Sequence, residues 1–402
     1  MIEYKLIILI ILITIYICTI YILSSNKKEK FESINNKLYY GLSCTYSKKD
    51  TFYETLHDLG YEETTDINKA TLIVPCTYDN TEKELNEINE KINNKNIRIY
   101  LLNNTDSIVS KLSLWKVLKG IYGINIALKL APMTWDIEED YDDFKKYFND
   151  NGGIYILKNN NQRQEGLKIV NSLEEIEKEK SNYILIQELL QDPYLINGRK
   201  INLRLYCLVI SDSNQNFKIL VYNDGFMYYT ADFFKKNTID HKYNITTGYI
   251  ERKVYEENPL THNDFRKYLD SDRELTEIEK ILRNRNILLS TYVFSQIYFL
   301  LKLVFSAYYN YLGNKSKGIN FQLYGVDIAV NDNLHPMIME INKGPDMNAK
   351  DTRDKQLKKN IAKDILKSVG LEKDINNQFK IIYENITIND KHISIDDLNN
   401  II

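Results

Sequence analysis

A chain of 402 residues is long enough for two or three domains. Hydrophobic residues make up 44% and charged residues 27%, as in an ordinary globular protein, and the net charge of -3 excludes a strongly basic nucleic-acid-binding chain. The four cysteines lie far apart and form no CxxC or Cys/His spacing. This spacing argues against a zinc site or a disulfide framework and favours a reducing compartment.

The chain begins with an uncharged apolar run from Leu6 to Leu23 that is just long enough to cross a bilayer. We therefore interpret residues 1–25 as a single transmembrane helix and residues 26–36 as a polar linker. A cleaved signal peptide and a buried helix are the alternatives. Because three lysines follow the run and one precedes it, the positive-inside tendency places the catalytic region on the cytoplasmic side.

Residues 37–108 alternate short apolar runs with helical patterns, which predicts a small parallel, Rossmann-like α/β domain. The expected strands are Leu38–Cys44, Ala70–Pro75 and Ile97–Leu102, and the expected helices are Asp50–Leu59 and Thr81–Ile92.

Residues 109–370 read as a second, α+β region, and residues 371–402 as a polar tail. This region is expected to hold a strand at Ile154–Lys158, a helix at Ser172–Lys180, a strand at Tyr183–Leu189 and a long helix at Asp264–Arg283. The apolar pattern Ile287–Leu312 is interrupted by polar residues, so we interpret it as a buried core helix instead of a second membrane span.

The most informative stretch is Gly325–Asp346, which has the pattern of a strand, a turn and a second strand. If Val330 pairs with Met337, the antiparallel register places Asp327 opposite Glu340. Asn342 then lies two residues on, on the same face as Glu340. Three oxygen-bearing side chains on an apolar hairpin favour a magnesium ion bound with a nucleotide, although capping or solvation of the hairpin explains them equally well.

A second concentration of signal is the strand pattern Gly198–Ile210, in which Lys200, Asn202 and Arg204 share one face. Two cations on a half-buried face favour a phosphate or a carboxylate, and an ordinary solvent-facing strand is the alternative. Upstream, Lys158 ends an apolar strand and precedes a polar loop, a position from which a lysine could hold phosphates. The strand end from Gln187 to Leu190 could present backbone groups to an adenine edge.

In this order the motifs resemble those of the tubulin–tyrosine ligase-like family, within the ATP-grasp superfamily. The resemblance covers residues 110–365 and rests on nine pieces, which are Lys111 with Leu114–Lys116, Pro132–Trp135, Tyr155–Lys158, Ile186–Leu190, Gly198–Arg204, Val221–Gly225, Ile245–Thr246, Leu323–Asp327 and Glu340–Asn342.

The resemblance implies an ATP-grasp fold that binds ATP and Mg2+ between two lobes. It also implies that an acceptor carboxylate takes phosphate from ATP and that the acyl phosphate is attacked by an amino acid. On this reading Lys200 and Arg204 are catalytic. The implied ATP-binding residues are Lys111, Lys158, Gln187, Glu188, Leu189, Leu190, Lys200, Asn202 and Thr246, and the implied metal ligands are Asp327, Glu340 and Asn342.

Three positions depart from the family pattern, because the family usually has an acid at Asn202, an arginine at Tyr228 and an asparagine at Thr247. The implied partners are therefore a free amino acid and a protein or peptide acceptor, with tubulin as one candidate. A catalytically silent nucleotide- or peptide-binding scaffold and a small-molecule ATP-grasp ligase remain as alternatives.

Overall fold

The computed structural model describes residues 37–41, 50–76, 81–94, 96–159, 166–212, 216–248, 250–309, 311–312, 318–373 and 376–385. The predicted transmembrane helix, the linker after it and the last part of the predicted tail lie outside the described residues.

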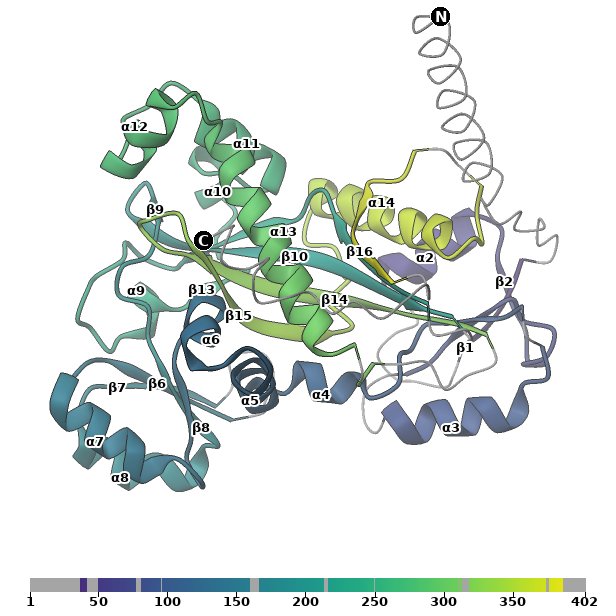
Figure 1. Ribbon diagram of the computed structural model, residues 1–402. Coiled ribbons are helices and arrows are strands. Elements are labelled where there is room, and N and C mark those ends of the chain that lie inside the picture. The colour runs from purple at the N-terminus through teal and green to yellow at the C-terminus, as the bar shows by residue number, and fades with distance from the viewer. Residues whose placement is uncertain are drawn as a thin grey trace, which may run out of the picture. The chain divides into compact units, whose positions relative to one another are not determined.

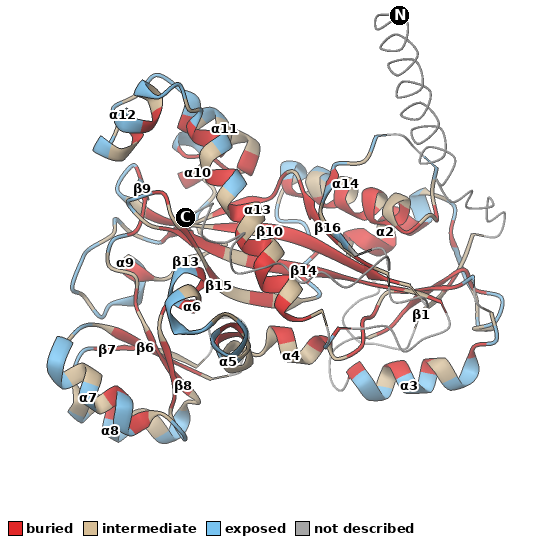
Figure 2. Cartoon of the chain, viewed as in Figure 1, coloured by how far each residue is buried: buried red, intermediate tan, exposed pale blue. Residues whose placement is uncertain are grey.

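One large mixed sheet runs through the described part of the chain, with its central strands buried (Figures 1 and 2). Its strand order is β13-β12-β10-β14-β4-β3-β1-β2, and four further strands pair beside this path: β9 and β11 with β10, β15 with β14, and β16 with β11. The C-terminal members are β9 (Leu195–Ile196), β10 (Arg199–Ser211), β11 (Phe217–Tyr222), β12 (Phe226–Thr230), β13 (Thr246–Thr247), β14 (Ile319–Val330), β15 (Pro336–Lys343) and β16 (Phe379–Asn385).

The N-terminal part of this sheet confirms the predicted parallel α/β pattern. Its strands β1 (Leu38–Gly41), β2 (Glu62–Glu63), β3 (Leu72–Val74) and β4 (Arg98–Ile99) are parallel, and its helices are α2 (Thr51–Asp58) and α3 (Thr81–Lys91). All three residues of β3 are buried, as expected for a strand covered on both faces. Because β4 also pairs in parallel with β14, the sheet continues unbroken into the C-terminal region.

A second, four-stranded antiparallel sheet has the order β5-β8-β6-β7. Its strands are β5 (Thr134–Asp136), β6 (Tyr155–Lys158), β7 (Leu167–Val170) and β8 (Leu185–Glu188). The helices α7 (Tyr141–Asn151) and α8 (Leu173–Glu179) lie beside it, and η1 (Lys180–Asn182) follows α8 (Figure 1). Trp135, Phe144 and Tyr155 centre its aromatic core, with ring centroids 5.1–5.9 Å apart.

The connection between the two sheets consists of α4 (Thr105–Val109), α5 (Lys111–Tyr122) and α6 (Ile124–Leu130). The long helix α13 (Leu289–Ala307) packs with the main core. Among the described residues α13 alone has the length and apolar composition of a membrane span, and 56% of its apolar window is buried inside the protein. The interpretation of this segment as a core helix is therefore confirmed.

The predicted long helix Asp264–Arg283 is wrong, since two helices occupy this region. They are α11 (His262–Asp270) and α12 (Glu277–Asn284), and each begins with a capping box. Thr276 and Glu279 form the second box, which starts a new helix where the apolar periodicity alone suggested continuity. The shorter α9 (His241–Asn244) and α10 (Val254–Glu257) precede this pair.

Two further expectations need correction near the ends of the described chain. After α14 (Thr352–Ser368), the start of the predicted tail forms β16, which pairs with β11. Cys76 is disulfide-bonded, whereas Cys207 is free and buried. This disulfide counts against the expected reducing compartment, because sequence spacing does not reveal which cysteines meet in the fold.

Candidate active site

The hairpin of β14 and β15 places Asp327 directly opposite Glu340, as the sequence predicted. The register predicted next to the turn is wrong, because Val330 pairs with Pro336 and not with Met337. A register shift between Asp327 and Ile328 restores the expected pair. The extra residue of this β-bulge also reverses the facing of β15, so that Ile338 and Ile341 are buried.

Arg204 lies beside Asp327 on the neighbouring strand β10, and the two side chains form a bidentate ion pair. The distances are 2.6 Å from Nε to Oδ1 and 2.9 Å from Nη2 to Oδ2. Burial raises the pKa of the Asp327 carboxyl and the guanidinium opposes that rise. A Cβ on Gly325 would come within 2.9 Å of Pro345 and 3.4 Å of Arg204, so glycine here leaves room for the guanidinium.

Glu340 is the next carboxylate on this face, and its Oε2 lies 3.9 Å from the Nζ of Lys111 at the start of α5. It also interacts electrostatically with Asp327 and with Lys158. Asn342 is half-buried two residues further along β15. The structure thus brings the three predicted metal ligands to one end of the hairpin, with Lys111 close to the middle one.

Lys158, at the end of β6, is held by a chain of side-chain hydrogen bonds. Its Nζ donates to Gln187 Oε1 over 2.6 Å, Gln187 Nε2 donates to Thr134 Oγ1 over 2.9 Å, and that hydroxyl donates to the Pro132 carbonyl over 3.0 Å. All three side chains are buried. Burial lowers the pKa of Lys158 to about 8; Glu340 opposes this shift and Lys111 adds to it.

Lys200, on β10, is the second deeply buried cation, with 4% of its surface exposed. Its Nζ donates over 3.4 Å to the carbonyl of Leu190. Burial lowers its pKa to about 7, with a further contribution from the positive charge of Lys158. Neither Lys158 nor Lys200 forms an ion pair with any described residue, so both are placed to receive an anion.

The strand end Gln187–Leu190 differs in part from the prediction. The N–H of Glu188 donates to Met133 and that of Leu189 donates to Ile154, so these two donors are occupied. Within the described chain the N–H of Leu190 has no acceptor, which leaves this group for a ligand. The Glu188 carboxylate accepts a hydrogen bond from Tyr147 over 2.8 Å.

The three departures from the family pattern lie side by side in the sheet. Asn202 pairs across the strands with Tyr228, and Tyr229 pairs with Thr247. The Arg204 guanidinium lies 5.1 Å from the centre of the Tyr228 ring, a cation–π contact. The Asn202 amide oxygen is buried without a hydrogen-bond partner among the described residues.

The outermost strand, β13, carries Thr246, which pairs with Thr230. Because β12 separates β13 from β10, the structure does not bring Thr246 as close to the buried cations as the other predicted residues. Thr134 and Tyr147 were missed as site residues, although Thr134 lies in one of the quoted motifs. Only the contacts made in three dimensions identify their roles.

The donor set fits both predicted ligands. Asp327, Glu340 and Asn342 offer hard oxygen atoms, which Mg2+ prefers. Lys158 and Lys200 pair with no carboxylate in the described part of the chain, and buried cations of this kind favour the phosphates of a nucleotide. This face can therefore hold a phosphate chain between the small sheet and the β14–β15 hairpin, with Arg204 beside it.

Comparison with known proteins identifies the family of the chain. The model of the tubulin-tyrosine ligase family matches residues 78–378, which include every predicted site residue. A probable tubulin polyglutamylase of Rattus norvegicus is 29% identical over 198 residues, covering 48% of this chain and 39% of that protein. A probable beta-tubulin polyglutamylase of Tetrahymena thermophila is 24% identical over 284 residues, covering 66% and 23%.

A tubulin polyglutamylase of Homo sapiens is 23% identical over 259 residues, covering 61% of this chain and 28% of that protein. The chain therefore spans between about a quarter and two fifths of the length of these curated relatives.

Proposed function

The chain belongs to the tubulin-tyrosine ligase family, and from that premise we propose that it is an ATP-dependent ligase that joins an amino acid to a protein or peptide. The observation that carries the proposal is that buried cations and carboxylates lie on separate elements of the candidate active site. Lys158 and Lys200 are buried and form no ion pair with a described residue, whereas the neighbouring hairpin carries Asp327 and Glu340. The phosphates of a nucleotide would compensate the charge of the lysines, and its metal ion would compensate the charge of the carboxylates.

In this reaction an acceptor carboxylate oxygen attacks the γ-phosphorus of ATP, and ADP leaves with the electron pair of the broken P–O bond. The amine of the amino acid then attacks the activated carbonyl carbon, loses a proton and displaces inorganic phosphate. Lys200 and Arg204 hold the phosphoryl and carboxylate oxygens where negative charge develops. Asp327, Glu340 and Asn342 would hold magnesium, which neutralises phosphate charge when bound.

We further propose glutamate as the amino acid and tubulin as one acceptor. The support is that the relatives described above are named tubulin polyglutamylases, although they extend well beyond the matched part.

The test is release of inorganic phosphate from ATP by the full chain, with glutamate and acceptor supplied together or separately. The proposal expects release only when Mg2+, glutamate and a protein acceptor such as tubulin are all present. Release that needs glutamate but ignores protein would instead identify a small-molecule ligase. No release with any acceptor pool would refute ligase activity, and ATP binding without release would identify a scaffold.

The scaffold is the second candidate, and the Asn202 amide favours it. This amide stands where the family usually has an acid, between two cations, and its oxygen has no hydrogen-bond partner among the described residues. A carboxylate would form charge-assisted bonds worth about 1.5–3 kcal/mol each. We therefore expect the natural chain to turn ATP over slowly and Asn202→Asp to raise the rate about tenfold. Equal rates in the two forms would remove this argument.

For localisation, we propose that residues 6–23 anchor the chain in a membrane, with the catalytic region on the cytoplasmic side. The lysines after the run support this topology, whereas the disulfide at Cys76 favours an oxidising compartment. Protease protection of membrane vesicles separates the two arrangements. Digestion of the catalytic region from the cytoplasmic side would support the proposal, and protection of that region would reverse the topology.

A further inference from the structure

Each carboxylate of the predicted metal site already has a cation of the protein beside it. Asp327 accepts both hydrogen bonds of its bidentate pair from Arg204, over 2.6 and 2.9 Å. The Oε2 of Glu340 lies 3.9 Å from the Nζ of Lys111. The third predicted ligand, the amide of Asn342, carries no charge. Together these side chains therefore have two negative and two positive charges, which give a net charge of zero.

Both pairs are partly shielded from water. The side chains of Arg204 and Asp327 are 14% and 16% exposed, and those of Lys111 and Glu340 are 10% and 30% exposed. Charges at such positions interact more strongly than charges in bulk water. A divalent cation that enters alone is therefore attracted by two carboxylates and repelled by two resident cations, so little net attraction remains.

The protein also offers the metal few ligands of its own. Among the residues that the structure describes, no group of three His, Cys, Asp or Glu side chains could hold a metal ion. Asp327 and Glu340 supply carboxylate oxygens and Asn342 an amide oxygen, whereas Mg2+ takes about six oxygen ligands. The other ligands have to be water or phosphate oxygens, and of these only phosphate brings negative charge.

The resident cations can change partners when phosphate enters. Arg204 directs two of its five N–H groups at Asp327 and donates no further hydrogen bond to a described residue. Lys158 interacts electrostatically with both Glu340 and Lys111, so a third cation faces the same space. Phosphate oxygens in this space would compete with the carboxylates for these cations, and the carboxylates would regain a net negative charge.

We propose that Arg204 and Lys111 gate the metal site, so that the chain binds a divalent cation only together with a nucleotide. The inference rests on the proposed ligase function and adds the dependence of one ligand on the other. Arg204 and Lys111 turn to the phosphates, and Asp327 and Glu340 are then available to the metal. By linkage, the metal must raise nucleotide affinity by the same factor as the nucleotide raises metal affinity.

The test is a titration of the full chain with Mn2+ in the absence of nucleotide, followed by electron paramagnetic resonance of the free ion. The natural chain should bind Mn2+ only weakly. Lys111→Met keeps the apolar stem and removes the charge, so it should raise the affinity for Mn2+ about tenfold or more. Lys111→Arg keeps the charge and should bind Mn2+ as weakly as the natural chain does.

Two further variants locate the ion that is gained. In the double variant Lys111→Met with Glu340→Gln the gain should be lost, because the second change removes the carboxylate that the first one released. Arg204→Met should raise Mn2+ affinity by a similar factor through Asp327, and its thermal unfolding midpoint shows whether it is folded. The Lys111 variants decide the outcome even where Arg204→Met does not fold.

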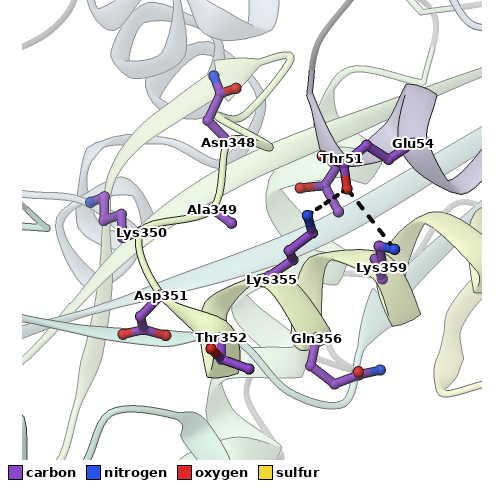
Figure 3. Close-up of a pocket in the computed structure, with 10 residues that line it drawn as sticks. All are labelled: Thr51, Glu54, Asn348, Ala349, Lys350, Asp351, Thr352, Lys355, Gln356 and Lys359. Atoms are coloured by element: carbon purple, nitrogen blue, oxygen red, sulfur yellow. Dashed lines mark ion pairs between the residues drawn. The ribbon is translucent and has the colours of Figure 1, made fainter.

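Two lysines outside the gate serve as matched controls. Lys116→Met removes a charge from the same helix, α5, where this lysine pairs with Asp136 at 2.6 Å. Lys355→Met removes a lysine that pairs with Glu54 at 2.8 Å in the pocket between α2 and α14 (Figure 3). Both should bind Mn2+ as the natural chain does. A gain as large as that of Lys111→Met would assign the effect to overall charge and overturn the inference.

The outcomes separate this inference from the ligase proposal. Tight binding of Mn2+ by the natural chain without nucleotide, or no gain in Lys111→Met, would overturn the inference and leave the ligase proposal intact. With ATP present, water proton relaxation reports Mn2+ that is bound to the protein. Enhanced relaxation in the natural chain is expected, and no enhancement in any form would refute the metal site and with it the proposed reaction.

Discussion

Two buried ionic clusters in this protein differ in how completely their own side chains satisfy them. On α12, Glu279 is fully buried and accepts hydrogen bonds from the Tyr194 hydroxyl over 2.7 Å, from Arg273 Nη1 over 3.1 Å and from the Thr276 N–H over 2.9 Å. On the catalytic face, Lys158 and Lys200 are buried beside neutral acceptors, and the Asn202 oxygen has no described partner.

The difference indicates which cluster is structural and which is functional. A complete network holds elements together and needs no ligand, because every buried polar group already has its partner. Buried cations without counter-charges lower stability in the free protein and gain from an incoming anion. The Glu279 cluster therefore fixes α12, and the lysine cluster is the one that we propose binds phosphate.

The largest expected effect comes from breaking the fully paired Glu279 cluster. Glu279→Ala leaves the partly exposed Arg273 without its fully buried counter-charge and should lower the free energy of unfolding by about 3 kcal/mol. Urea unfolding measures the change, and nucleotide titration of the folded variant should give the ATP affinity of the natural chain. Glu277→Ala, which removes an exposed carboxylate two residues away on the same helix, should leave the free energy of unfolding nearly unchanged. Comparable losses in the two variants would contradict the comparison.

The next effect concerns the catalytic face, where Lys158 and Lys200 form what we call the open cluster. Glu340→Gln removes a charge from the predicted metal site with almost no change in side-chain shape, so turnover should fall by about a hundredfold or more while the unfolding midpoint stays. Phosphate release at several Mg2+ concentrations measures it. Glu139→Gln, at an exposed ion pair with Lys116, is the control. Turnover by Glu340→Gln at the natural rate would show that the metal lies elsewhere.

Because the pKa of Lys200 is lowered, ATP affinity should depend on pH. In the free protein its pKa is about 7, and a bound phosphate raises it, so ATP binding above that pH must take up a proton. ATP affinity should therefore fall with rising pH, by at most about tenfold per unit for a single group. Calorimetry in buffers of different ionisation enthalpy measures the uptake. Affinity that rises with pH would contradict the assignment.

The same pKa has a consequence for stability. A lysine whose pKa is lowered by folding binds fewer protons in the native state than in the unfolded state. The nucleotide-free protein should therefore become more stable as pH rises from about 7 toward the ordinary lysine value of about 10.4, as far as Lys200 and Lys158 determine it. The Glu279 carboxylate contributes nothing in this range, since it is already ionised.

The smallest expected effect tests the hydrogen-bond chain behind Lys158. Thr134→Val leaves the Gln187 amide without its buried acceptor, at a cost of about 1–3 kcal/mol that is shared between stability and ATP binding. As a positioning residue, Thr134 should affect KM for ATP more than kcat. Thr134→Ser keeps the hydroxyl and should restore the natural KM. Equal KM values for Thr134→Val and the natural chain would leave this hydrogen-bond chain with a structural role only.

Sequence patterns predicted most elements and the main members of the site, because strand alternation places Lys200, Asn202 and Arg204 on one face whatever the tertiary contacts are. They failed where the fold departs from periodicity. The bulge beside Asp327 gave the expected pair through an unexpected register, and Thr276 starts a second helix inside an apparently continuous one. The hydrogen bonds of Thr134 and the pairing of Asn202 with Tyr228 join residues that are distant in sequence, so no local pattern reveals them.

The central claim is that the open cluster uses ATP to form an amide bond on a protein, and mass spectrometry of the acceptor tests it most directly. Tubulin incubated with the full chain, ATP, Mg2+ and isotopically labelled glutamate should gain labelled glutamyl residues in amide linkage. The same incubation with Glu340→Gln, or without ATP, should give none. Labelled acceptor in the absence of ATP, or equal labelling by the natural chain and Glu340→Gln, would contradict the account.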